Sequence, residues 1–232
     1  MGPKILVMIP ALNEENSIAS VVRDVKTALP TASVLVVDDG STDNTAKNAE
    51  KAGALLLRLP FNLGIGGAVQ SGYLFAMRNG YDIAVQIDGD GQHDPAFIPD
   101  MLTRLDSFDL VIGSRFVSNV GFRSTAMRRI GIGILSGLLK ALTGQRFTDP
   151  TSGFRVANRR VIEHCAANYS QDFPEVESLL HLRREGLSIT ESPVVMRQRS
   201  YGRSSINWTK SLWYMMKVSL SLCIGLARRR VP

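Results

Sequence analysis

Short apolar segments alternate with amphipathic segments through the first half of this chain, and no other feature constrains the fold as strongly. The apolar segments are rich in Val, Ile and Leu, which predicts strands, and the segments between them have the spacing of helices that bury one face. The predicted strands cover residues 5–10, 34–37, 54–59 and 82–87, and the predicted helices cover residues 14–29, 42–51 and 64–78. This order predicts an α/β fold with a mainly parallel, doubly wound sheet and right-handed crossovers.

The second half continues the pattern less regularly. We expect a strand at residues 109–114, a helix at 175–184 and a strand at 187–195. A length of 232 residues with 44% hydrophobic content suits one α/β domain with a modest appendage. We therefore predict one domain at residues 1–205, followed by an amphipathic helix and a basic tail at residues 206–232.

The cysteines and the N-terminal residues indicate the compartment. Cys165 and Cys223 lie in apolar surroundings without metal or redox spacing, so we expect reduced, buried thiols. A strand-like run follows Met1 almost directly, and it lacks the long apolar core and cleavage site of a signal peptide. These features predict a cytoplasmic protein.

Charge is distributed unevenly along the chain. Residues 1–109 contain 8 basic and 14 acidic side chains, whereas residues 110–232 contain 19 and 7. Two stretches without any Asp or Glu, 110–148 and 192–232, each include an apolar helical pattern that is too short or too interrupted to span a bilayer. We expect these helices to lie at the cytoplasmic face of a membrane; the alternative is that they pack on the core and their arginines face solvent.

The strand predicted at residues 82–87 leads into a pair of carboxylates, Asp88 and Asp90, separated by one glycine. Ligands of α/β folds bind at the carboxyl ends of parallel strands, which is where this pair is expected. Two carboxylates at this spacing can hold a divalent cation against a diphosphate. Residues 88–93 therefore predict a metal site.

A second acidic pair, Asp38 and Asp39, follows the strand predicted at residues 34–37. The following Ser, Thr and Asp residues at 41–43 could simply cap the next helix after a turn at Gly40. Adjacent aspartates at a strand end repel each other, however, and need a ligand, a cation or hydrogen-bond donors. The hydroxyls of a ribose or the imide of a base would supply such donors. The glycine cluster at residues 62–68 lacks a full dinucleotide fingerprint and instead indicates a helix start with close backbone approach.

These motifs together resemble the inverting glycosyltransferases of family 2, which have the GT-A fold, a Rossmann-like fold of nucleotide-diphospho-sugar transferases. The resemblance rests on residues 10–15, 36–43, 62–66 and 88–93, which stand in order at suitable spacings. Residues 113–115, 149–155 and 199–205 are similar to the subgroup that contains dolichol-phosphate mannose synthase and bacterial polyprenyl-phosphate glycosyltransferases. The matching motifs extend over nearly the whole chain.

The resemblance implies a role for each matching residue. The nucleotide sugar would contact Pro10, Leu12, Glu14, Asp38, Asp39 and Asp88. Mg²⁺ or Mn²⁺ would be held by Asp88, Asp90 and Gln92. Catalysis would rest on Asp90, Arg115, Arg129 and Arg199, and the acceptor phosphate would meet Arg115, Arg129, Arg203 and Ser204. The subgroup usually has lysine at the position of Ser205, so Arg203 is expected to supply that basic contact.

The chemistry implied is transfer of a hexose from a UDP- or GDP-linked donor to undecaprenyl or dolichyl phosphate. A cation and arginines would stabilise the departing diphosphate. A phosphate acceptor is already anionic near neutral pH, so no general base is needed. His93 could serve as such a base, but a His-Asp-Pro sequence also caps a helix, which is the more common role.

Several alternatives compete with this interpretation. The basic pI of about 9.6 is compatible with nucleic-acid binding, but no recognition motif is present and the acidic first half would repel a phosphate backbone, so we expect no nucleic-acid partner. A nucleotidyltransferase would need a glycine-rich loop with lysine after the first strand to bind a triphosphate, and the sequence has no such loop there. Two further alternatives stay open: a catalytically inactive protein that binds a nucleotide sugar, and an enzyme that transfers to a sugar hydroxyl of a lipid-linked glycan or polysaccharide.

The expected partners are a nucleotide sugar, a polyprenyl phosphate and a membrane surface, with a second copy of the chain as a further option.

Overall fold

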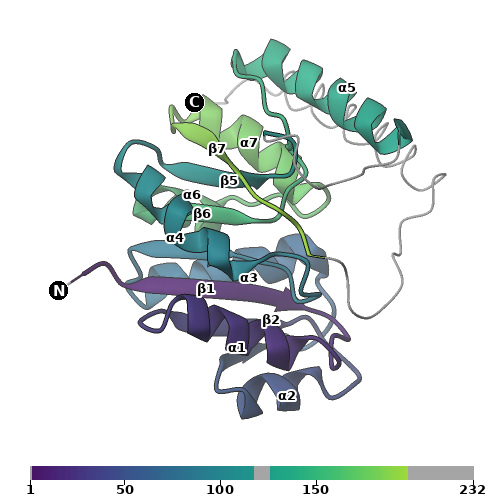
Figure 1. The fold of residues 1–232 in the computed structure, drawn as a ribbon, viewed down its shortest axis with the longest axis vertical. Helices are drawn as coiled ribbons and strands as arrows, with labels where there is room; N and C mark the ends of the chain where they lie inside the picture. Colours follow the sequence, from purple (N-terminus) through teal and green to yellow (C-terminus); the bar gives the residue numbers. More distant parts are fainter. Residues whose placement is uncertain (1, 118–125, 198–232) are drawn as a thin grey trace.

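The computed structural model describes residues 2–117 and 126–197 of the chain. Its centre is a seven-stranded sheet of order β3-β2-β1-β4-β6-β5-β7 (Figure 1). The strands are β1 (Ile5–Ala11), β2 (Ser33–Asp38), β3 (Leu55–Arg58), β4 (Ile83–Gln86), β5 (Leu110–Ser114), β6 (Arg155–Asn158) and β7 (Ile189–Pro193). All pairings are parallel except those of β6, which runs antiparallel to both β4 and β5. The mainly parallel α/β sheet is therefore confirmed.

Helices cover both faces of this sheet. They are α1 (Ile18–Ala28), α2 (Thr45–Lys51), α3 (Gly64–Arg78), α4 (Ile98–Thr103), α5 (Ala126–Thr143), α6 (Arg159–Ala167) and α7 (Pro174–Arg184), with short 3-10 turns η1 (Pro95–Phe97) and η2 (Arg104–Asp106) on either side of α4. One core cluster joins the sheet to α3, α5, α6 and α7, and the other joins it to α1, α2 and α4. In Figure 1, α5 lies at the end of the molecule opposite α2.

The central strand β1 shows how the sequence produces these two cores. Leu6 and Met8 belong to the first cluster, and Val7 and Ile9 belong to the second. Successive side chains of a strand point to opposite faces, so a strand covered on both sides must be apolar at every position. All four side chains are at most 1% exposed, which explains the continuous apolar run.

Two of the predicted helices begin later than expected. The helix expected from residue 14 begins at Ile18, and the helix expected from residue 42 begins at Thr45. The intervening residues bind each other instead, because Asn13 has a left-handed backbone (φ 54°) and accepts a hydrogen bond from the amide of Thr42. These two loops thus form a joined rim at the carboxyl ends of β1 and β2.

The glycine cluster at the start of α3 is explained by packing. A Cβ atom on Gly66 would lie 2.5 Å from the carbonyl oxygen of Ser170 and 2.6 Å from the Cα of Gln171. Only glycine allows the helix to approach this backbone so closely. The prediction of a close backbone approach is confirmed.

Helix α5 uses part of its apolar surface inside the protein. Leu135 and Leu139 are at most 1% exposed and belong to the first core cluster, whereas Ile134 on another side is 54% exposed. The core alternative therefore accounts for one face of α5, and membrane contact by its outer face stays a prediction. Within the described residues, no helix is long and apolar enough to cross a membrane. The helix predicted at residues 206–232 lies outside the described residues.

Candidate active site

The carboxyl ends of β1, β2 and β4 bring the predicted acidic motifs to one edge of the sheet. Residues Ala11 and Asp38 are paired across β1 and β2, and Asp39 donates its amide hydrogen to the carbonyl of Ala11. Strand β4 pairs with the other side of β1 and leads into Asp88. A Cβ atom on Gly89 would lie 3.3 Å from the carbonyl oxygen of Pro10. Residues 88–93, where the metal site is predicted and which we call the metal loop, therefore touch the end of β1.

The aspartate pair at the end of β2 is held by donors of the protein itself. Asp38 is 1% exposed; its Oδ1 accepts the amide of Ser41 at 3.0 Å, and its Oδ2 lies 3.4 Å from Nε of Arg58. Asp39 accepts the amides of Leu63 at 2.7 Å and Gly64 at 3.0 Å, at the start of α3.

These contacts account for one of the two carboxylates. Backbone donors at the start of α3 stabilise Asp39, whereas the buried Oδ2 of Asp38 accepts no hydrogen bond from the described residues and has only Nε of Arg58 near it. Binding of base and ribose by Asp38 and Asp39 stays a prediction. Of the proposed capping residues, Asp43 accepts the amide of Thr45, the first residue of α2, although the N-cap position itself is Asn44; Ser41 and Thr42 bind Asn13 in the neighbouring loop.

The metal loop begins directly after β4. The carboxylate of Asp88 is 42% exposed and Asp90 is 9% exposed. Asp90 Oδ1 accepts the amide of Gln92 at 2.9 Å, which closes a tight turn around Gly91, whose φ is 78°. The loop therefore carries the three predicted metal ligands within five successive residues, 88–92, at the edge of the sheet.

His93 lies beneath this loop and is 3% exposed. Its Nδ1 accepts the amide of Asp88 at 3.0 Å, its Nε2 lies 3.6 Å from Oδ2 of Asp88, and its ring stacks on Phe154 at a centroid distance of 5.0 Å. Burial lowers the pKa of His93 to about 4, against the opposing effect of Asp90. A neutral, enclosed imidazole fits a role in fixing Asp88 better than the role of a general base. The capping role belongs to Asp94, which accepts the amide of Ala96 at 3.0 Å in η1.

The lowered pKa predicts how His93 affects stability. The unfolded chain protonates this histidine near pH 6.5, and the folded protein does so only near pH 4, so its contribution is fully present above pH 6.5 and is lost as the pH falls toward 4. We expect the difference in unfolding free energy between wild type and His93→Gln to shrink by about 3 kcal/mol over this window. Urea unfolding at pH 7.5, 6, 5 and 4 measures it. A pH-independent difference would contradict the assignment, and His181→Gln is the control.

Arg115 forms a buried ion pair. Its Nε and Nη2 each lie 2.6 Å from an oxygen of Asp149; Arg115 is 7% exposed and Asp149 is fully buried. Glu191 of β7 accepts the amides of Thr148 and Asp149, which fixes the loop that carries Asp149. Burial raises the pKa of Glu191 despite these hydrogen bonds. The phosphate contact predicted for Arg115 stays a prediction, and the structure shows that Asp149 orients its guanidinium.

A buried polar layer lies under Asp88 on the side of α7. Gln86 and Arg155 are paired across β4 and β6 and are at most 1% exposed. Arg155 donates to Ser178 Oγ at 2.7 Å and to the carbonyl oxygen of Glu175 at 2.6 Å, whereas neither amide atom of Gln86 has a hydrogen-bond partner among the described residues. Burial raises the pKa of Glu175, the positive charge of Arg155 opposes this effect, and the charge of Asp88 adds to it.

The remaining predicted residues are placed as follows. Leu12 is 41% exposed in the loop after β1, and Glu14 in the same loop accepts a hydrogen bond from Ser17 Oγ. Arg129 is exposed in the first turns of α5. Arg199, Arg203 and Ser204 lie outside the described residues.

Sequence reasoning missed three residues that shape this site. Asp149 stood in a recognised motif without a role, and the signal was its position beside a proline in an otherwise acid-free region. Glu191 and Arg197 gave no local signal, because their partners lie more than 40 residues away in the chain.

Comparisons with known proteins decide the family. The family model described as glycosyl transferase family 2 matches residues 6–165. The chain belongs to this family. It is 29% identical over 225 residues to polyprenol monophosphomannose synthase of Mycolicibacterium smegmatis, covering 92% of this chain and 85% of that protein. It is 30% identical over 213 residues to undecaprenyl-phosphate mannosyltransferase of Micrococcus luteus, covering 88% of each.

A solved structure supports the fold of this glycosyltransferase. Glucosyl-3-phosphoglycerate synthase of Mycobacterium tuberculosis, crystallised with Mn²⁺, UDP-glucose and phosphoglyceric acid, superposes with a TM-score of 0.71. The likeness covers 96% of this chain and 80% of that one at 25% identity. The GT-A fold expected from the sequence is thereby confirmed.

The residues of this glycosyltransferase fit a divalent cation that is shared with a substrate. Within residues 2–117 and 126–197, no group of three His, Cys, Asp or Glu side chains is placed to hold a metal. Mg²⁺ and Mn²⁺ prefer oxygen ligands, and Mg²⁺ in particular is usually held by one or two carboxylates together with substrate phosphates. Asp88 and Asp90, one partly open and one enclosed, provide such a half-site.

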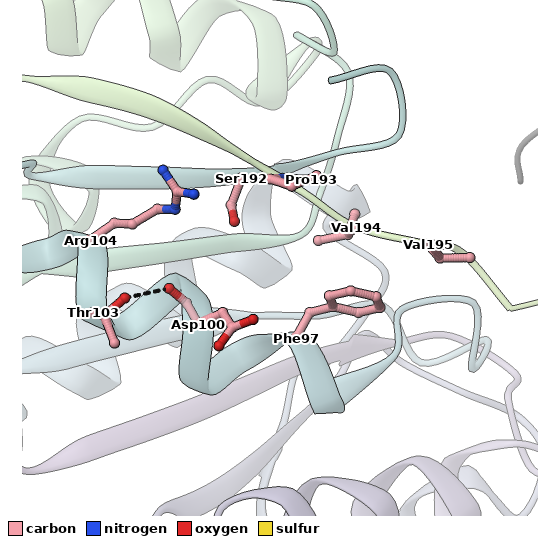
Figure 2. Close-up of a pocket in the computed structure, with 8 residues that line it drawn as sticks. All are labelled: Phe97, Asp100, Thr103, Arg104, Ser192, Pro193, Val194 and Val195. Atoms are coloured by element: carbon pink, nitrogen blue, oxygen red, sulfur yellow. Dashed lines mark hydrogen bonds between the residues drawn. The ribbon is translucent and has the colours of Figure 1, made fainter. Parts of the chain in front are cut away.

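A groove lined by other residues is distinct from this site. It has a volume of about 490 Å³ and lies between α4 and β7 (Figure 2). It is lined by Phe97, Asp100, Thr103, Arg104, Ser192, Pro193, Val194 and Val195. None of the predicted donor or metal ligands lines it, so we do not assign it to the nucleotide sugar.

Proposed function

We propose that this glycosyltransferase moves a hexose from a nucleoside-diphosphate sugar to a polyprenyl phosphate, with Mg²⁺ or Mn²⁺ and with inversion at the anomeric carbon. The observation that carries the donor half is the position of Asp88 and Asp90 beside the ends of β1 and β2, where Pro10, Asp38 and Asp39 also lie. The acceptor half is supported by two relatives, one named as a polyprenol monophosphomannose synthase and the other as an undecaprenyl-phosphate mannosyltransferase.

In the proposed reaction, the acceptor phosphate oxygen attacks C1 of the sugar as the bond from C1 to the donor diphosphate breaks. The nucleoside diphosphate leaves with the bonding electrons. A bound cation would neutralise the charge that grows on this diphosphate. Asp88 and Asp90 would hold that cation, and the loops after β1 and β2 would orient the nucleotide.

The proposed transfer to a phosphate needs no general base, and the environment of His93 agrees with this. A phosphate monoester is ionised near neutral pH, so its oxygen attacks without losing a proton. The imidazole of His93 is enclosed, and its Nδ1 is used by the amide of Asp88. The chain would therefore hold its metal loop with this histidine rather than move a proton with it.

Transfer to a sugar hydroxyl is the second candidate. A hydroxyl acceptor needs a base near the metal loop, and the carboxylate of Glu175, whose pKa burial raises, is influenced by the charge of Asp88. Glu175→Gln separates the two functions, because it should abolish transfer to a hydroxyl but spare transfer to a phosphate.

The test is a panel of UDP- and GDP-linked sugars with Mg²⁺ or Mn²⁺, incubated with and without undecaprenyl or dolichyl phosphate. The measured quantities are label in the organic phase and released nucleoside diphosphate. Label that depends on the lipid phosphate would support the proposal and identify the donor. Donor binding without lipid labelling across the panel would contradict it and favour a glycan hydroxyl as acceptor.

Arg129 provides a prediction for the acceptor. This residue is exposed at the start of α5, in a region without acidic side chains, which suits contact with a lipid phosphate. We expect Arg129→Ala to raise the acceptor KM or lower kcat by about tenfold or more while donor affinity changes little. Lys140→Ala, near the other end of the same helix, is the control. Equal losses of donor and acceptor affinity would contradict the assignment.

A further inference from the structure

We infer that Arg197 is a positioning residue for the metal loop, and that it acts together with Asp24 on the outer surface of α1. This inference rests on the proposed metal site at Asp88 and Asp90. Arg197 itself is not a ligand in that proposal. Its position is defined by contacts to two separate parts of the chain, the loop at residues 92–94 and helix α1.

The backbone of Arg197 binds the metal loop directly. Its amide donates to the carbonyl oxygen of Gln92 at 2.9 Å. Gln92 is the third predicted metal ligand, and its own amide binds Asp90 Oδ1 at 2.9 Å. The residue that closes the turn around the carboxylates is therefore fastened from both sides, by Asp90 through its amide and by Arg197 through its carbonyl.

The side chain of Arg197 bridges two carboxylates. Nη2 lies 2.8 Å from Oδ1 of Asp94, which also accepts the amide of Ala96 in η1, and Nη1 lies 2.5 Å from Oδ2 of Asp24. Asp94 is thus held where the metal loop ends. A guanidinium that spans two carboxylates restricts both of them, because its donors point in fixed directions.

Through Asp24, Arg197 also connects the metal loop to helix α1. Asp24 lies on α1, whose buried side packs in the second core cluster through Val21, Val22 and Val25. Arg197 is the side-chain partner of Asp24 in the described part of the chain. The helix therefore acts as a rigid support, and Arg197 transmits its position to the loop.

The segment that carries Arg197 connects the loop to β7. Val194 donates its amide to the carbonyl oxygen of Ser114 at the end of β5, and the chain then leads toward the half of the sheet that contains β1 (Figure 1). Figure 2 shows Val194 and Val195 on this path, opposite Phe97. The metal loop is thus clamped between α1 and the segment after β7, and rigid outer contacts of this kind orient metal ligands.

The experiment compares wild type with Arg197→Ala, Asp24→Asn and the double variant. Arg159→Ala is the matched control, because Arg159 forms an ion pair with Glu163 on α6, away from the loop, at similar exposure. Hydrogen exchange of residues 88–97 without metal reports on the clamp. Calorimetric titration with UDP and with GDP, in the presence and absence of Mn²⁺, reports on its consequence.

We expect both single variants to speed exchange in residues 88–97 and to weaken Mn²⁺-dependent nucleotide binding by about tenfold. The double variant should be no weaker than Arg197→Ala, because the two residues form one contact. Unchanged exchange in Arg197→Ala would overturn the clamp, and faster exchange with wild-type Mn²⁺-dependent affinity would overturn its role in positioning the metal loop. If wild type itself binds neither nucleotide in a Mn²⁺-dependent way, the proposed function fails. The exchange data then still show whether Arg197 restrains residues 88–97.

Discussion

We expect Asp90→Asn to reduce sugar transfer by about a thousandfold or more without unfolding the protein. The structure separates the two effects. Asp90 Oδ1 accepts the amide of Gln92, and an asparagine oxygen at the same position can accept this bond. The turn therefore survives, whereas the negative charge that would hold a cation is lost. Steady-state kcat/KM with saturating Mn²⁺ measures the activity, and thermal unfolding measures the fold.

Asp106→Asn is the matched control for this prediction. Asp106 is exposed in the turn before β5. Its replacement by asparagine removes the same charge from the same half of the chain. Wild-type activity of Asp106→Asn would show that net charge is not responsible. Wild-type activity of Asp90→Asn would remove the basis for the metal site.

The elements of the first half were predictable because their signals are local. Helix α3 was expected at residues 64–78 and is found there, and the strand expected at residues 5–10 extends by one residue. Strands β1 and β2 are buried on both faces, so their sequences are almost entirely apolar. The delayed starts of α1 and α2 were not predictable in this way, because they depend on hydrogen bonds between Asn13 and the loop at residues 41–42.

Strand β6 shows what local patterns cannot reveal. It begins with Arg155, and an arginine ordinarily indicates an exposed position. Here the side chain is 1% exposed, because Ser178 and the carbonyl of Glu175 satisfy its donors from more than 19 residues away. The antiparallel pairing of β6 with β4 and β5 likewise joins segments that are more than 40 residues apart in the chain.

The site was predicted in its motifs but not in its connections. Asp88 and Asp90 were expected at a strand end and are found there, since the carboxyl ends of parallel strands share one edge. The partner of each charge was not predicted. Arg115 was expected to face a phosphate, and the sequence did not indicate that Asp149 would bind it at two points.

We expect Asp149→Ala to destabilise the protein by about 3–5 kcal/mol, because it leaves the buried guanidinium of Arg115 without its counter-charge. Both side chains are at most 7% exposed, so solvent cannot replace the lost partner. Urea unfolding should show a lower midpoint with an unchanged slope. Glu163→Ala, which breaks the exposed pair with Arg159 on α6, should cost less than about 1 kcal/mol and serves as the control.

The double variant Arg115→Met, Asp149→Leu separates the structural from the functional role of this pair. Removing both buried charges should restore at least about half of the lost stability, because two apolar side chains of similar volume need no counter-charge. If Arg115 also contacts a substrate phosphate, as the family resemblance implies, the double variant should be folded but inactive. Restored stability together with wild-type transfer would show that Arg115 serves the fold alone, and the phosphate contacts would then have to come from other cations of the basic half, such as Arg129.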